Sequence, residues 1–185
     1  MNLPNKLTII RILLVPVYVG LMYFDNPVSY WAASFVFAAA CLTDFLDGMI
    51  ARKTNQISTF GKLMDPIADK LLVMSALVLL TFQHKMPAWV TIIMLAREFI
   101  ISGFRLVAIG EGKIISADIF GKIKTVIQML FIMLAMLLLP VANGYQPLGQ
   151  NGALIVSIVM YISLGITLLS GILYVWKNRN LLKDS

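Results

Sequence analysis

The chain has 185 residues, of which 59% are hydrophobic and 13% are charged. Because soluble globular domains are typically about 45–50% apolar, this composition indicates one membrane-embedded domain over residues 1–185. The single cysteine, Cys41, excludes a disulfide framework. The net charge of +6 comes from basic residues at the ends of apolar runs, which is not the pattern of a protein that binds nucleic acid.

Six apolar segments follow one another along the chain, and each is close to the roughly 20 residues that a helix needs to span a bilayer. The links between them are short and carry helix breakers, among them Pro27, Pro87 and Pro147. We therefore predict an all-α membrane protein with six transmembrane helices. The segments are Leu7–Phe24, Ser29–Arg52, Lys62–Phe82, Pro87–Gly110, Ala117–Pro140 and Gly152–Trp176.

Lysine and arginine are distributed unequally between the two sets of links. Both chain ends and alternate links carry most of them, whereas the opposite links carry only Lys85. Because the cytoplasmic loops of membrane proteins are enriched in basic residues, we expect both termini to lie in the cytoplasm. The basic residues on that side are Lys6, Arg11, Arg52, Lys53, Lys113, Lys122, Lys124, Lys177, Arg179 and Lys183.

Four aspartates lie within the second and third predicted helices or at their ends, namely Asp44, Asp47, Asp65 and Asp69. A carboxylate inside a membrane costs a few kcal/mol and is functional by default. At about 100° per residue, the two aspartates of each helix share one face. If the two faces meet, four carboxylates converge and need cations to neutralise them. Carboxylate oxygens without a nearby cysteine or histidine favour hard ions such as Mg²⁺ or Mn²⁺.

Small residues and one arginine accompany the carboxylates at helical spacing. Gly48 and Ala51 fall on the face of the second helix that carries its aspartates, and Gly61 lies four residues before Asp65. These positions leave room for a bulky polar ligand, and Arg52 is suited to bind a phosphate through two hydrogen bonds. The alternative is that the charges only pair inside the bundle, with Lys70 neutralising Asp65 or Asp69.

Written in one line, the stretch reads Asp44-x2-Asp47-Gly48-x2-Ala51-Arg52-x8-Gly61-x3-Asp65-x3-Asp69. It resembles the signature of the CDP-alcohol phosphotransferase family at every fixed position. Three further stretches look like the bacterial branch of that family that makes phosphatidylglycerophosphate. They are Leu3-Pro4-Asn5-Lys6-Leu7-Thr8-Ile9-Ile10-Arg11 near the start, Arg97-Glu98-Phe99 with Arg105, and Gly121-Lys122-Ile123-Lys124-Thr125.

The resemblance implies a reaction and assigns roles to residues. CDP-diacylglycerol and sn-glycerol 3-phosphate would give phosphatidylglycerophosphate and CMP. One or two ions of Mg²⁺ or Mn²⁺ would be held by Asp44, Asp47 and Asp65, with Asp69 nearby, and Asp69 matches the proton acceptor of the family. The positions that match the CDP-binding site are Asn5, Thr8, Gly48, Arg52 and Ser58. Family members are commonly homodimers.

An acceptor that carries a phosphate needs a second cationic pocket. Its candidates are Arg97, Arg105, Lys122 and Lys124. Two simpler interpretations stay open: the lysines could serve only to orient the chain in the membrane, and Arg97 could pair internally with Glu98.

A site at the cytoplasmic ends of the second and third helices, in the bacterial plasma membrane, would let the lipid enter sideways while the acceptor arrives from water. Two other functions remain open. The same chemistry could use another alcohol, such as inositol phosphate or serine, or the chain could be a cation transporter. The arginine beside the carboxylates argues against transport, because a cation pathway has no need of a phosphate-binding group. A purely structural membrane protein would tolerate Asp44→Asn in every activity assay.

Overall fold

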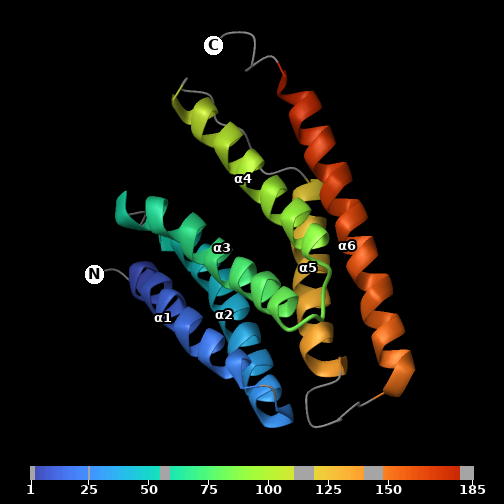
Figure 1. Cartoon of the computed structure of the whole chain (residues 1–185). Helices are drawn as coiled ribbons and strands as arrows, with labels where there is room; N and C mark the ends of the chain where they lie inside the picture. The colour runs from blue at the N-terminus through green and yellow to red at the C-terminus, as the bar shows by residue number, and fades with distance from the viewer. Residues whose placement is uncertain (1–2, 25, 55–58, 111–118, 140–147, 180–185) are drawn as a thin grey trace.

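The computed structural model describes the backbone of residues 3–24, 26–54, 59–110, 119–139 and 148–179. Within these ranges, the side chains of residues 3–7, 44–54, 59–66, 69 and 109 are not described. The described chain forms six α-helices (Figure 1). They are α1 (Leu3–Tyr23), α2 (Pro27–Thr54), α3 (Thr59–Phe82), α4 (Ala88–Gly110), α5 (Ile119–Leu138) and α6 (Gly149–Lys177).

The all-α prediction is confirmed, and each predicted segment overlaps one helix. The main differences lie where polar sequence flanks the apolar runs. The first helix begins at Leu3, and α2 and α3 extend through most of the aspartate-bearing stretch, to Thr54 and from Thr59. Helical hydrogen bonding does not stop where hydrophobicity stops, because lysine, arginine and methionine are also good helix formers. The apolar runs therefore identified the helices but placed these ends too far inward.

Two helices, α5 and α6, are long and apolar enough by themselves to cross a membrane. The other apolar helical stretches found in the described parts of the chain are shorter and comprise Thr8–Tyr23, Pro27–Thr43 and Lys70–Phe82. The predicted six segments are therefore confirmed as helices. The number of helices that cross the membrane stays a prediction.

The helices pack as two groups of three, α1 to α3 and α4 to α6, which meet along α3 and α5. In one group α1 contacts both α2 and α3, and in the other α6 contacts both α4 and α5. Contacts of α5 with α2 and α3, and of α3 with α4, join the groups. Successive helices alternate in direction, so the start of α1, the end of α2 and the start of α3 lie toward the same end of the bundle (Figure 1).

Aromatic and small residues fill the core between the helices. Tyr18 and Phe37 lie with ring centroids 5.8 Å apart, and the Tyr18 hydroxyl donates a hydrogen bond to Met136 Sδ at 3.4 Å. Ala40 and Ala76 are fully buried, and such small side chains let helix backbones approach closely. This packing fixes α1, α2 and α5 against one another.

Gly152 marks a close approach between the end of α5 and the start of α6. A methyl group at this position would lie 3.0 Å from the Leu138 carbonyl oxygen and 3.3 Å from Leu148 Cβ. Both neighbouring atoms belong to or adjoin the backbone and cannot rotate away. We therefore predict that Gly152→Ala lowers the free energy of unfolding by about 1–3 kcal/mol, measured as earlier thermal unfolding in detergent.

The matched control is Gly165→Ala in the same helix, where an added methyl group meets nothing within 4 Å. Alanine is the better helix former, so the control should unfold at an equal or higher temperature. Equal unfolding temperatures for the two variants would show that the contact at Gly152 relaxes without cost.

Candidate active site

The aspartate signature lies at the ends of two helices that α1 holds in place. Asp44 and Asp47 belong to the last three turns of α2, and Asp65 and Asp69 to the first three turns of α3. Their side chains lie outside the described residues, as do those of Asn5, Gly48 and Arg52 and the whole of Ser58. Within the described part, no three potential metal ligands gather. The predicted metal and CDP sites therefore stay predictions.

Two polar side chains in the first three turns of α1 are buried in the bundle. Thr8 is fully buried and Arg11 is 1% exposed, and α1 packs on both α2 and α3. The start of α1 lies at the same end of the bundle as the end of α2 and the start of α3 (Figure 1). The helices thus carry four of the predicted CDP-binding positions, Asn5, Thr8, Gly48 and Arg52, toward one end of the bundle, and their binding of CDP stays a prediction.

A cavity of about 320 Å³ opens between α3, α4 and α5. It adjoins the signature, because Lys70 on its wall directly follows Asp69 in α3. Basic side chains dominate the described lining, where Glu98 is the one carboxylate. The lining comprises Lys70, Arg97, Glu98, Ile101, Ser102, Arg105, Gly121, Lys122, Thr125 and Val126. An excess of positive charge in a partly enclosed space favours an anionic ligand.

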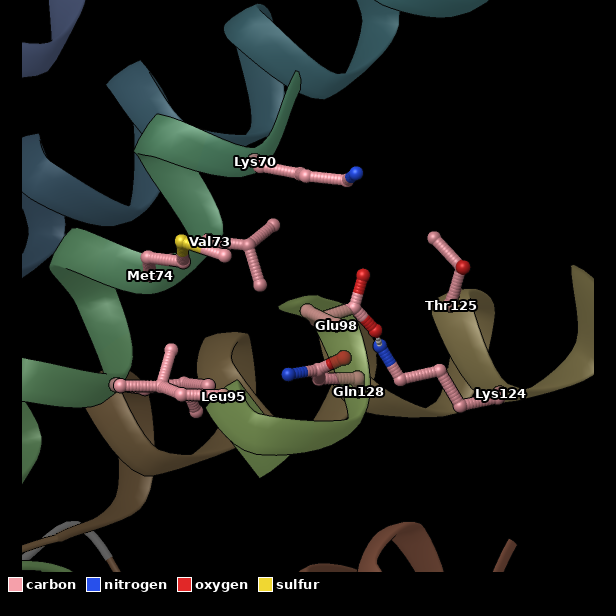
Figure 2. Close-up of a pocket in the computed structure, with 9 residues that line it drawn as sticks. Lys70, Val73, Met74, Leu95, Glu98, Lys124, Thr125 and Gln128 are labelled. Atoms are coloured by element: carbon pink, nitrogen blue, oxygen red, sulfur yellow. Dashed lines mark hydrogen bonds and ion pairs between the residues drawn. The ribbon is translucent and has the colours of Figure 1, made fainter. Parts of the chain in front are cut away.

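Glu98 is the centre of a network of charged and polar groups on this wall. Its Oε1 accepts a hydrogen bond from Arg97 Nη1 at 3.1 Å. The same oxygen accepts an ion-paired hydrogen bond from Lys124 Nζ, as Figure 2 shows. The Glu98 side chain is 15% exposed and that of Lys124 is 3% exposed. Lys70 Nζ donates to Ser102 Oγ, which in turn donates to the Glu98 carbonyl oxygen at 2.6 Å. The network ties together α3, α4 and α5.

The guanidinium of Arg97 is held in a slot that small residues make possible. Its Nη2 donates a hydrogen bond to Ser170 Oγ on α6 at 2.7 Å. A methyl group at Gly171 would lie 3.1 Å from Arg97 Cγ, and one at Gly121 would lie 3.8 Å from Nη2. The absence of a side chain at Gly171 therefore lets the Arg97 stem pass between α4 and α6.

The four predicted acceptor-binding residues fall into two places. Arg97, Arg105 and Lys122 line the 320 Å³ cavity. Lys124 does not; it is buried, pairs with Glu98, and lines a neighbouring cavity of about 30 Å³ with Gln128. The predicted alternative of an Arg97–Glu98 ion pair is also present, and pairing does not remove Arg97 from the cavity wall. Whether any of the four binds an acceptor stays a prediction.

Sequence reasoning missed three residues of the cavity. Ser102 lies four residues after Glu98, and therefore on the same helical face, so a face-by-face reading of α4 could have found it. Thr125 follows Lys124 inside a stretch already singled out. Lys70 was considered only as a partner for an aspartate, and nothing in the sequence showed that its side chain reaches α4.

The comparison with protein families decides where the chain belongs. The model described as CDP-alcohol phosphatidyltransferase matches residues 1–169. The chain belongs to the CDP-alcohol phosphatidyltransferase family. The match includes the signature on α2 and α3 and all the residues that line the cationic cavity.

Three curated proteins that are similar to this chain carry the same name. The Bacillus subtilis CDP-diacylglycerol–glycerol-3-phosphate 3-phosphatidyltransferase is 38% identical, over 100% of this chain and 98% of the relative. A Rickettsia typhi protein of the same name is 36% identical, over 94% of each. One from Escherichia coli K12 is 41% identical over 69% of this chain and 72% of the relative. The similarity to the first two relatives therefore spans nearly the whole length on both sides.

Proposed function

We propose that this family member transfers the phosphatidyl group of CDP-diacylglycerol to sn-glycerol 3-phosphate, giving phosphatidylglycerophosphate and CMP. The observation that carries the proposal is the cationic cavity beside the signature, where Lys70 follows Asp69. Such a cavity suits an acceptor with a phosphate and has no role for a zwitterionic acceptor such as serine. Relatives named for this reaction, similar over almost their full length, support the choice of acceptor.

We propose that all six helices cross the bacterial plasma membrane, with both termini and the active site on the cytoplasmic side. Large apolar side chains are exposed on every helix, as a lipid-facing surface requires and a soluble monomer rarely shows. Examples, one from each helix in order, are Leu13, Phe35, Val78, Ile92, Leu130 and Ile172. The excess of lysine and arginine on alternate links supports the orientation. The homodimer that the resemblance implies stays part of the proposal.

In the proposed reaction a hydroxyl oxygen of the acceptor forms a bond to the phosphorus next to the lipid. The bond from that phosphorus to the CMP oxygen breaks, and the hydroxyl proton passes to Asp69. Arg52 places a positive charge near the leaving phosphate. Asp44, Asp47 and Asp65 are oxygen donors of the type that holds Mg²⁺ or Mn²⁺, and such an ion would neutralise charge on the diphosphate.

The cavity would hold the other end of the acceptor. Arg97, Arg105 and Lys122 converge on it from α4 and α5, and guanidinium groups bind phosphate oxygens through two parallel hydrogen bonds. Arg97 is already oriented by Ser170 and Glu98, so little side-chain entropy remains to be lost on binding. A phosphate held there would position the hydroxyl end of the molecule toward Asp69, one residue before Lys70.

The decisive experiment measures CMP release by the purified protein with CDP-diacylglycerol, Mg²⁺ or Mn²⁺, and one acceptor at a time. We expect release with glycerol 3-phosphate, little with serine or inositol phosphate, and none after EDTA treatment. Release with another alcohol alone would retain the chemistry and overturn the acceptor. Cation flux in proteoliposomes without CDP-lipid, together with no CMP release, would favour the transporter.

The carboxylates should separate into ligands and base when each is replaced by asparagine. Asp44→Asn, Asp47→Asn and Asp65→Asn should abolish turnover, because a neutral amide binds a divalent cation poorly. Asp69→Asn should lower kcat by roughly 10²–10⁴ while donor affinity is retained. The measurement is kcat beside equilibrium binding of the CDP-lipid. Donor affinity that falls in step with kcat would identify Asp69 as a ligand instead.

The slot around Arg97 gives a test that leaves every charged group in place. Gly171→Ala pushes against the Arg97 stem at 3.1 Å and should raise the KM for glycerol 3-phosphate by roughly threefold or more, since small displacements of a positioning group are costly. Gly165→Ala, earlier in the same helix with nothing within 4 Å of the added methyl group, is the matched control. An equal KM in both variants would remove Arg97 from the acceptor site.

A further inference from the structure

The carboxylate of Glu98 uses one oxygen inside the protein and turns the other toward the small cavity, which shares Lys70, Glu98 and Thr125 with the cationic cavity. Both Arg97 and Lys124 donate to Oε1. No described residue donates a hydrogen bond to Oε2, and Figure 2 shows this second oxygen pointing into the space between Lys70 and Thr125. Glu98 lines the cationic cavity as well as the small one beside it. A ligand in the cavity can therefore reach a fixed, charged acceptor of hydrogen bonds.

A carboxylate repels a bound phosphate, so its presence in a cationic cavity suggests that it contacts another part of the ligand. The basic side chains of the lining offer only donors, which suit phosphate oxygens but not hydroxyl hydrogens. The hydroxyls of Ser102 and Thr125 already donate to the carbonyl oxygens of Glu98 and Gly121, at 2.6 Å and 3.0 Å. Glu98 Oε2 is thus the strongest hydrogen-bond acceptor that the described lining offers to a ligand.

We propose that Glu98 determines specificity for the acceptor by binding the hydroxyl that does not react. This assignment rests on the proposed function. Glycerol 3-phosphate has two hydroxyls: the primary one, which is less hindered, attacks the phosphorus, and the secondary one donates to Glu98 Oε2. The ion pairs with Arg97 and Lys124 hold the carboxylate in place, so a hydroxyl at the right distance from the phosphate is selected.

The test compares glycerol 3-phosphate with 3-hydroxypropyl phosphate, which keeps the phosphate and the primary hydroxyl and lacks the secondary one. The quantity measured is the ratio of kcat/KM for the two acceptors. The wild-type protein should prefer glycerol 3-phosphate by roughly tenfold to a hundredfold, because the analogue leaves Glu98 Oε2 unpaired in the closed site. Glu98→Met, of similar size but without a hydrogen-bond acceptor of comparable strength, should bring the ratio close to one.

Two further variants separate this role from a purely structural one. Lys124→Met breaks the ion pair but keeps the carboxylate, so activity should fall with both acceptors while the ratio stays near the wild-type value. Glu98→Met combined with Lys124→Met removes both buried charges together and avoids leaving Lys124 beside an apolar partner. This double variant should show the low ratio of Glu98→Met, even if the single variant does not fold.

The possible outcomes test the role of Glu98 separately from the proposed transfer reaction. CMP release by the wild-type protein with glycerol 3-phosphate supports the proposed function whatever the ratio is. A wild-type ratio near one, or a ratio that stays at the wild-type value in Glu98→Met or the double variant, would overturn the role of Glu98 alone. No release with glycerol 3-phosphate would overturn the proposed function and this assignment with it.

Discussion

Charged side chains within an apolar bundle must satisfy one another, and this constraint organises the contact between α3, α4 and α5. Lys124 is almost completely buried, and its ammonium group donates a hydrogen bond to the carboxylate of Glu98, which offsets part of the cost of burying the charge. The same carboxylate oxygen also receives Arg97 Nη1. The position of the cationic cavity depends on this network, because removing the carboxylate would take away the group that both cations contact.

The network also explains how α4 is held against both α3 and α6. Arg97 bonds to Glu98 on its own helix and to Ser170 on α6, while Lys70 of α3 bonds to Ser102 of α4. Each of these bonds pairs polar groups that are partly buried in the bundle, where an unpaired polar group is expensive. The polar contacts between helices therefore fix the geometry of the cavity walls as well as stabilising the bundle.

The fold could be predicted from the sequence to the level of its helices, because long apolar runs between breakers leave few alternatives. The facing ends of α2 and α3 were predicted to within a few residues, at Arg52 against Thr54 and at Lys62 against Thr59, since their polar signature gives no sharp hydrophobic boundary. Part of the site could have been refined further from helical geometry alone. Lys122 and Lys124 are two residues apart, about 200° around a helix, so both could not face one cavity. The meeting of Lys70 with α4 depends on tertiary packing that one helix does not reveal.

The two charged regions complement each other across Lys70 and Asp69, which are adjacent in sequence. In the proposed mechanism the carboxylates of the signature bind metal cations, and the basic groups that line the cavity bind the phosphate of the acceptor. A donor diphosphate and an acceptor phosphate repel each other, so a catalyst that joins them must neutralise each separately. Placing one set of charges on the ends of α2 and α3, and the other set between α3, α4 and α5, meets this requirement. Because α3 contributes to both sets, its helical backbone fixes the distance between them, and the reacting groups can be aligned without a large motion of the bundle.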